Sequence, residues 1–207
     1  KVRPMYNELK EKSINGGLIT PKAAYGYFPC YSEGNSLFVE SANGLHEFSF
    51  PRQELSPHFC ISDFYHTKKE GGDIASFFVV TIGERIDEEI KKLFTGDEYH
   101  DYLIMHGFSV EVTDALAEYW HEEMRKEMGV INNNPQEMTG YITQEYQGSR
   151  YGFGYPACPE LDAHKEVFKL IKPEGIGVTL TENMQMVPEQ TTSAIIAHHP
   201  QAKYFAV

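Results

Sequence analysis

The segment Arg150–Glu160 (RYGFGYPACPE) contains residue types that suit the binding of a small charged ligand. Arg150 offers a planar guanidinium group that can pair with a carboxylate. Tyr151, Phe153 and Tyr155 offer aromatic faces that could meet a purine or a sulfonium cation. Gly152 and Gly154 allow the backbone to approach a ligand closely, and two prolines stiffen the loop. On composition alone, a rigid structural loop explains the same residues equally well.

The same loop matches a loose dinucleotide-binding pattern, with Gly152, Gly154 and Ala157 at the spacing G-x-G-x-x-A. That pattern requires an apolar strand before it and a helix that begins inside it. Residues 144–148 are polar, and the prolines would interrupt the helix, so we reject this interpretation.

Cys158 is a candidate nucleophile, because a cysteine at a helix N-terminus is favoured as a thiolate. No cysteine-protease signature surrounds it, and His164 is expected to point along the helix, away from the thiol. A small packed residue is the simpler interpretation, and an independent thiol enzyme is kept as a competing hypothesis.

Histidines raise the question of a metal site. His198 and His199 are adjacent, and adjacent histidines on a strand face opposite ways, so they cannot share an ion. His121 lies in a polar helical stripe that we expect to be solvated or salt-bridged, and we therefore predict no metal. The other members of that stripe are Asp114, Glu118 and Arg125.

The first half of the chain predicts antiparallel β-structure. Apolar runs at 25–28, 37–40 and 45–50 are separated by turn signals at 33–35 and 43–44. The pair Asn43-Gly44 is a strong hairpin signal, because both turn residues of such a hairpin need positive φ. Ile74–Ile82 is almost entirely apolar, which predicts a central strand buried on both faces.

Helices dominate the second half. We predict helices over 98–108 (capped by Asp97), 113–128, 135–146 and 161–171, the last with Pro159 in its first turn. Further strands are predicted over 176–181, 192–197 and 203–207. By composition, the pair Tyr204-Phe205 is ordinary strand packing. The order of these elements predicts one α+β domain over 1–207, a twisted antiparallel sheet with hairpins and flanking helices. The 113–128 helix is expected to have an apolar side made of Val112, Leu116, Tyr119, Trp120 and Glu123.

Composition excludes several classes of protein. The net charge of −12 and the lack of a basic stripe argue against nucleic-acid binding. No apolar run reaches the ~18–20 residues needed to cross a bilayer, and no signal peptide is present. Three widely spaced cysteines argue against a disulfide framework. We expect a cytoplasmic protein with no membrane partner.

Arg150 followed by Gly154–Glu160 (GYPACPE) resembles the signature of the activation domain of cobalamin-dependent methionine synthases. Further segments resemble the family in the same order along the chain, and the resemblance runs from about Ala24 to Val207. These segments are Ile61–Phe64 (ISDF), Ala117–Lys126 (AEYWHEEMRK), Leu180–Pro188 (LTENMQMVP) and His199–Val207 (HPQAKYFAV).

The resemblance implies a module that binds S-adenosylmethionine within a methyltransferase for methionine biosynthesis (5-methyltetrahydrofolate–homocysteine methyltransferase). It presents the methyl group to inactive cobalamin (vitamin B12) held by a neighbouring domain of the same enzyme, after flavodoxin or a flavin reductase supplies an electron. The isolated fragment is expected to be inactive.

By position, the resemblance implies that Arg150 grips the methionyl carboxylate. Tyr155 and the backbone from Gly152 through Gly154 to Ala157 would line the pocket. Asp114 would lie near the ligand's amino group, where the family has a glutamate. Tyr204 and Phe205 would contact the nucleoside. No residue is expected to act as a catalytic acid, base or nucleophile.

Two departures from the family stand out. The family contributes an aspartate from further upstream, for which residues 1–18 offer no counterpart, and the family continues beyond the last strand. We therefore expect the domain to be truncated at both ends. An alternative is a non-catalytic module that caps the cobalamin domain and recruits the reductase through a basic patch at Lys165, Lys169 and Lys172.

Overall fold

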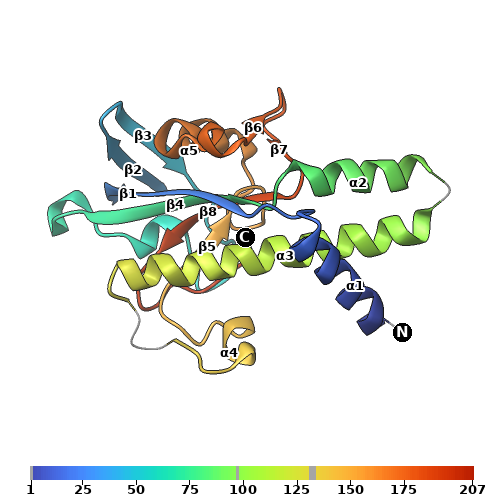
Figure 1. The fold of residues 1–207 in the computed structure, drawn as a ribbon. Coiled ribbons are helices and arrows are strands. Elements are labelled where there is room, and N and C mark those ends of the chain that lie inside the picture. Colours follow the sequence, from blue (N-terminus) through green and yellow to red (C-terminus); the bar gives the residue numbers. More distant parts are fainter. Residues whose placement is uncertain (1, 97, 131–133) are drawn as a thin grey trace. The chain divides into compact units, whose positions relative to one another are not determined.

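The chain divides into two units in the computed structural model, which describes residues 2–96, 98–130 and 134–207. The first unit contains Lys1–Ala24, Val79–Tyr119 and Pro173–Thr192. The second contains Tyr25–Phe78, Trp120–Lys172 and Ser193–Val207. Figure 1 shows the elements in chain order.

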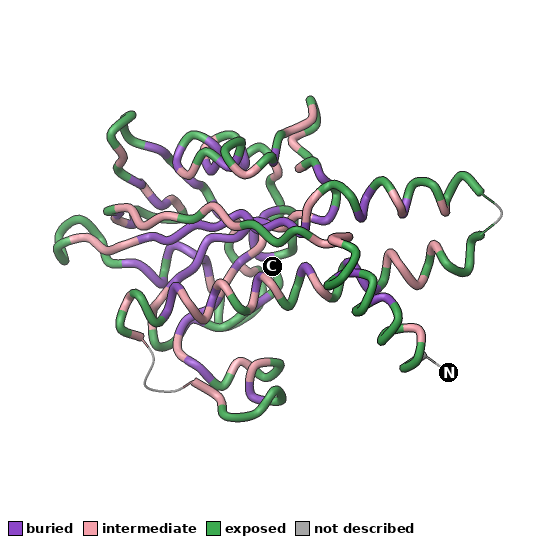
Figure 2. Tube along the Cα trace, in the orientation of Figure 1, coloured by how far each residue is buried: buried purple, intermediate pink, exposed green. Residues whose placement is uncertain are grey.

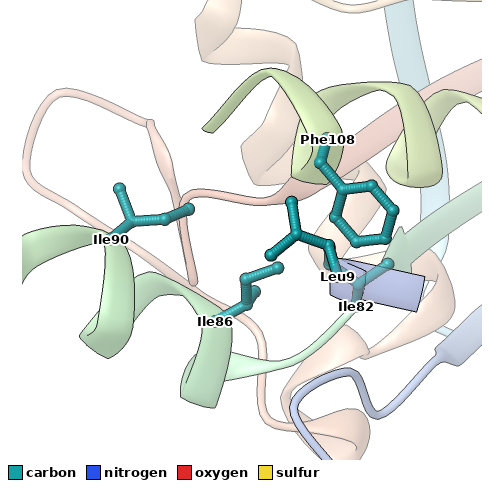
Figure 3. Close-up of a cluster of buried hydrophobic side chains, with 5 residues drawn as sticks. All are labelled: Leu9, Ile82, Ile86, Ile90 and Phe108. Atoms are coloured by element: carbon teal, nitrogen blue, oxygen red, sulfur yellow. The ribbon is translucent and has the colours of Figure 1, made fainter. Parts of the chain in front are cut away.

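The first unit is built on helices. It contains α1 (Val2–Asn15), α2 (Glu84–Thr95), the larger part of α3 (Tyr99–Glu127) and the short hairpin of β6 (Thr179–Leu180) and β7 (Met186–Val187). Ile86 and Ile90 lie one turn apart on α2, so they share one face of that helix. Their core cluster is completed by Leu9, Ile82 and Phe108 (Figure 3).

The second unit contains most of a six-stranded sheet in the order β3-β2-β1-β4-β8-β5. Its strands are β1 (Lys22–Glu33), β2 (Ser36–Ser41), β3 (Gly44–Ser49), β4 (Asp73–Thr81), β5 (Ser149–Gly152) and β8 (Thr191–Ala197). The pairs β1–β2, β2–β3 and β5–β8 are antiparallel. Residues Ala75 to Val80 of the central strand β4 are fully buried (Figure 2), as its apolar run predicts. This confirms the α+β class.

Shorter elements complete the second unit. They are 3-10 turns at Ile61–Phe64, Lys68–Glu70 and Leu161–Ala163, the helix α4 (Met138–Ile142) and the helix α5 (His164–Ile171). A further 3-10 turn at Pro173–Ile176 belongs to the first unit. Among the described helices, none has an apolar stretch long enough to cross a membrane.

Several predicted boundaries were wrong. The predicted helices at 98–108 and 113–128 form the single helix α3, because no proline or cap separates them; the proposed cap Asp97 lies outside the described residues. α2 was missed, since its many charges hide a narrow apolar face. Helix 135–146 shortens to α4, and strand 176–181 shortens to β6. Ser41 pairs with Gly44, so the β2–β3 turn is Ala42-Asn43 rather than Asn43-Gly44.

The predicted last strand, 203–207, is also wrong, because these residues pair with no strand. Side chains hold the segment instead. Tyr151 Oη donates to the Lys203 carbonyl oxygen at 2.9 Å, and Gln53 Nε2 donates to the Ala206 carbonyl oxygen at 2.6 Å.

Candidate functional site around Arg150

Arg150 lies on β5, which is the last strand at one edge of the sheet. It pairs with Ile196 of β8, and the following Tyr151 pairs with Ile195. Because successive side chains of a strand point to opposite faces, Arg150 and Tyr151 face opposite sides of the sheet. Tyr151 is fully buried, whereas Arg150 is half-buried. Of the two side chains, only that of Arg150 is accessible to a ligand.

The loop after β5 is closed by its own backbone. The Gly154 amide donates to the Cys158 carbonyl oxygen at 2.8 Å, and the Cys158 amide donates to the Tyr155 carbonyl oxygen at 2.8 Å. Gly154 has φ +86°, a conformation that side chains rarely adopt. A Cβ atom on Gly152 would lie 2.8 Å from the Tyr155 ring, so this glycine makes room for that ring. The tyrosine is 54% exposed, which leaves it accessible to a ligand.

The other aromatic residues of the loop are core residues. Phe153 is 5% exposed and packs against Phe48 and His164, with ring centroids 6.2 and 5.6 Å away. Of the three aromatic faces predicted for a ligand, Tyr155 is thus the accessible one.

Cys158 is buried, and its environment disfavours the thiolate form that a nucleophile needs. Burial raises the pKa of its thiol to about 12. Its predicted helix also begins later, since α5 starts at His164 after a 3-10 turn. His164 Nε2 lies 2.8 Å from Ser193 Oγ instead. The burial of Cys158 therefore gives no support to an independent thiol enzyme.

Tyr204 and Phe205 lie beside Tyr151. The Tyr204 ring is stacked on the Tyr151 ring with centroids 6.4 Å apart, and the Phe205 ring is 5.6 Å away. Phe205 is buried against Phe59 and Phe64. Tyr204 is 44% exposed, so it is the member of the pair that can meet a ligand.

The segment Gln144–Tyr146 connects these parts. The Lys203 ammonium donates to the carbonyl oxygens of Gln144 and, at 3.2 Å, of Tyr146. The Tyr204 amide donates to Gln144 Oε1 at 3.2 Å. These contacts tie the aromatic pair to the chain that leads into β5. Sequence reasoning missed them, because backbone acceptors leave no signature in the sequence.

The polar stripe of α3 is buried where it enters the second unit, contrary to prediction. His121 and Arg125 are both 0% exposed. Arg125 Nη1 donates to Asn134 Oδ1 at 2.6 Å, and its guanidinium lies 3.9 Å from the centroid of the Tyr146 ring. The expected apolar side is only partly buried, and Tyr119 is 56% exposed. The sequence did contain a pattern that could have predicted this burial. Ala117, His121, Met124 and Arg125 recur at helical spacing on one face of α3.

Comparison with known protein families identifies the family of this chain. Residues 5–207 match the family of the vitamin B12 dependent methionine synthase, activation domain. The chain belongs to this family. The activation domain of this chain is 40% identical over 215 residues to the methionine synthase of Mycobacterium tuberculosis (strain ATCC 25618 / H37Rv) and 39% identical to that of Mycobacterium leprae (strain TN). Each match covers 96% of this chain but only 18% of the relative, so the chain spans about a fifth of their length.

A solved structure is also similar to this activation domain. It is described as the crystal structure of the MetH reactivation domain bound to AdoHcy, with a TM-score of 0.90 and 26% sequence identity. The match covers 99% of this chain and 66% of that chain. The predicted fold and family are thereby confirmed.

Within the activation domain, the second unit contains Arg150, Tyr155, Tyr204 and the loop backbone from Gly152 to Ala157. Tyr204 stacks on Tyr151, whose side chain faces the side of the sheet opposite to Arg150, so a common site for these residues stays a prediction. Asp114 is exposed and belongs to the first unit, so its predicted role stays a prediction. One hollow of about 530 Å³ in the second unit is lined by residues 51–55, 206 and 207. None of the predicted site residues lines it.

The structure also bears on the dinucleotide-binding pattern and on a possible metal site. A strand does precede the G-x-G-x-x-A pattern, but β5 is short and antiparallel to its neighbour, and the next α-helix begins only at His164. A dinucleotide fingerprint needs a parallel βαβ unit, so its rejection is supported. The described residues contain no cluster of three or more metal-ligating side chains.

Proposed function

We propose that this activation domain binds S-adenosylmethionine and serves the reductive methylation of inactive cobalamin in a methionine synthase. The observation that carries the proposal is the placement of Arg150 on the edge strand β5, directly before a loop that exposes Tyr155. Tyr204 is also exposed and stacks on Tyr151, the residue after Arg150. The similar MetH domain was solved with AdoHcy, the demethylated form of the same ligand, which supports this ligand class.

Each group suits one part of the ligand. The Arg150 guanidinium can hold the methionyl carboxylate through two parallel hydrogen bonds. The exposed faces of Tyr155 and Tyr204 offer stacking surfaces for the adenine ring or a favourable site for the sulfonium. The Gly152–Ala157 backbone, which includes Tyr155, could supply hydrogen bonds to the nucleoside. Phe205 is buried against Phe59, Phe64 and Tyr151, so we assign it a packing role.

When bound, the ligand would supply an electrophilic methyl group to the reduced cobalt of cobalamin, with S-adenosylhomocysteine as the leaving group. We assign no acid or base among the described residues to this step, since the sulfonium is already a good leaving group. The domain's contribution is binding and orientation. The cobalamin is expected on a neighbouring domain, and the electron is expected from flavodoxin or a flavin reductase.

Calorimetric titration of the 207-residue chain with S-adenosylhomocysteine tests the proposal. Arg150→Ala should weaken binding by roughly 10- to 150-fold, since a charge-assisted hydrogen bond contributes about 1.5–3 kcal/mol. Lys169→Ala is the matched control, because this cation pairs with Glu166 and should leave the affinity unchanged. Equal affinities of wild type and Arg150→Ala would show that Arg150 does not bind the ligand.

The alternative is a module that only caps the cobalamin domain and recruits the reductase. Its suggested basic patch is weakened by local acids, since Lys165 pairs with Asp162 and Lys169 with Glu166, at 2.8 and 2.7 Å. This alternative predicts that neither the wild type nor its variants bind S-adenosylhomocysteine. The same titration therefore distinguishes the ligand-binding function from the interaction module.

A further inference from the structure

Ser41, His46 and Glu166 form a chain of hydrogen bonds at the β3 end of the sheet, whereas Arg150 lies on the strand at the opposite end. Ser41 Oγ lies 2.9 Å from His46 Nε2, and His46 Nδ1 lies 2.7 Å from Glu166 Oε2. A serine, an imidazole and a carboxylate joined in this order are the parts of a hydrolytic triad, which is recognised by its geometry and not by sequence position. None of the three belongs to the proposed ligand site.

The β2–β3 hairpin brings the serine and the histidine together. Ser41 pairs with Gly44, and Val39 pairs with His46, so Ser41 and His46 are diagonal neighbours on one face of the hairpin. Glu166 comes from α5, which lies beside this hairpin (Figure 1). His46 is 5% exposed, so packing and two hydrogen bonds hold its ring in one orientation.

The carboxylate of Glu166 fixes the proton on the His46 ring. Burial raises the pKa of Glu166, but the hydrogen bonds from Lys169 and His46 outweigh it, so the group is ionised at neutral pH. An ionised carboxylate only accepts hydrogen bonds, and His46 Nδ1 must therefore carry the shared proton. In the neutral ring, Nε2 then has a lone pair that accepts the proton of Ser41 Oγ. This is the tautomer that a general base needs.

Ser41 keeps access to solvent at the end of β2. Its side chain is half-buried, and the turn residues Ala42, Asn43 and Gly44 beside it are exposed. The Asn43 amide donates to Ser41 Oγ at 3.0 Å, which favours negative charge on this oxygen as its proton leaves. Ser41 Oγ also lies 3.3 Å from the Gly44 carbonyl oxygen. A hydroxyl group has one proton, and the shorter contact with His46 Nε2 is the better use of it.

We propose that Ser41 is a nucleophile for small activated carboxylic esters, with His46 as its general base and Glu166 as a positioning residue. Ser41 Oγ attacks the ester carbonyl carbon while its proton passes to His46 Nε2. The bond to the leaving oxygen then breaks, and this oxygen takes up the proton. Water attacks the acyl-serine by the same route, which releases the carboxylic acid and restores the serine. The exposed turn suits a small ester whose leaving group is already good.

Labelling of the 207-residue chain with an alkyl fluorophosphonate tests the nucleophile. Attack forms a stable bond from the serine oxygen to phosphorus and expels fluoride, so peptide mass spectrometry can follow each serine over time. Ser36 is the internal control, because it lies on the same strand but its Oγ donates to Glu47 Oε1 at 2.8 Å. Ser41 should react roughly 100-fold faster than Ser36, the lower end of what a general base contributes. Equal rates would overturn the inference.

Variants assign the other two roles. His46→Gln should slow the labelling of Ser41 to the rate of Ser36. Glu166→Gln should slow it as well, because the new amide can donate to Nδ1 and so move the ring proton to Nε2. Nitrogen NMR of the His46 ring should show the proton on Nδ1 in wild type and on Nε2 in Glu166→Gln, a change that a merely structural role would not produce. Lys165→Ala is the control on α5, since Lys165 pairs with Asp162, and it should keep the wild-type rate.

Hydrolysis of p-nitrophenyl acetate tests the substrate class. Wild type should release p-nitrophenolate faster than Ser41→Ala, and Ser36→Ala should match the wild type. Equal release by wild type and Ser41→Ala would overturn the inference, as would unchanged labelling of Ser41 in His46→Gln. If a variant fails to fold, the comparison of Ser41 with Ser36 in wild type still decides the matter. Binding of S-adenosylhomocysteine is a separate measurement, so failure here would leave the proposed function intact.

Discussion

The guanidinium of Arg125 lies over the face of the Tyr146 ring, 3.9 Å from its centroid, and neither side chain is more than 3% exposed. A permanent charge is thus held in the interior by an aromatic face and by the amide oxygen of Asn134. Such a cation–π contact gains strength when it is desolvated. The same tyrosine accepts the Lys203 hydrogen bond through its carbonyl oxygen, so it links the interior of the unit to the segment that carries Tyr204.

Arg125→Ala should lower the free energy of unfolding by about 2–4 kcal/mol, because it removes the cation–π contact, a charged hydrogen bond and the packing of a long buried stem. Urea unfolding followed by circular dichroism measures the change. Lys126→Ala is the control, since Lys126 is exposed and its ion pairs with Glu122 and Glu123 should contribute less than about 1 kcal/mol. Similar losses in both variants would contradict the assigned role of Arg125.

Gly154→Ala should destabilise the chain by about 1–2 kcal/mol. The residue has positive φ, and a Cβ atom there would lie 2.8 Å from Leu161 Cδ2. Gly175→Ala is the matched control, because nothing lies within 4 Å of its Cβ position and its φ is not positive. Thermal unfolding of the two variants should differ clearly, and equal midpoints would show that the loop relaxes around the added methyl group.

Glu166→Gln should remove a pH-dependent part of the stability. Burial raises the pKa of Glu166, but hydrogen bonds from Lys169 and His46 outweigh it, so the net pKa is lowered. A carboxyl group with a lowered folded pKa stabilises the fold above its unfolded pKa, and this contribution is lost as the pH falls through the folded value. We expect a loss of about 0.5–1 kcal/mol at pH 7 that shrinks as the pH falls below the ordinary glutamate pKa of about 4.3 and vanishes below the lowered pKa of the folded state.

The control for Glu166 is Asp162→Asn, whose carboxylate pairs with Lys165 but whose side chain is 74% exposed. It should change the stability little at any pH. A Glu166→Gln deficit that persists at pH 3 would mean that the carboxylate charge is not its origin.

Cys158 should resist alkylation in the folded chain. A thiol with a pKa of about 12 carries roughly a thousandfold less thiolate at neutral pH than an exposed cysteine. Iodoacetamide at pH 7.5, followed by mass spectrometry of the peptide, should label Cys158 in urea and leave it unlabelled in buffer. Fast labelling of the native chain would revive a role for this thiol.

Strands were easier to predict from the sequence than helices. The apolar run of β4 and the alternating runs of β2 and β3 have few other ways to bury their side chains. The helix α2 was missed because Ile86 and Ile90 are separated by charged residues, and its burial depends on Leu9 and Phe108, which are distant in sequence. The wrongly predicted last strand, 203–207, likewise depends on residues distant in sequence. Side chains of Gln53 and Tyr151 donate hydrogen bonds to its backbone carbonyl oxygens.

The candidate site itself stays a prediction, and the structure adds the surroundings of its residues. The motif around Arg150 identified the loop, and the second unit brings Tyr204 to its neighbourhood through Tyr151. The buried state of His121 and Arg125 was not predicted, because charged residues are rarely buried and their spacing equally fits a solvated face. Only the three-dimensional structure reveals Tyr146 as the aromatic surface that receives them.

The position of β5 at the end of the sheet has a consequence for solubility. An open strand edge is a template on which another chain can add a strand and start aggregation. β5 is only four residues long, carries Arg150 in its middle, and runs directly into a loop with two prolines. A short, charged edge that ends in a proline-containing turn is a poor template. The arginine proposed to hold a ligand would therefore also protect the edge strand against unwanted pairing.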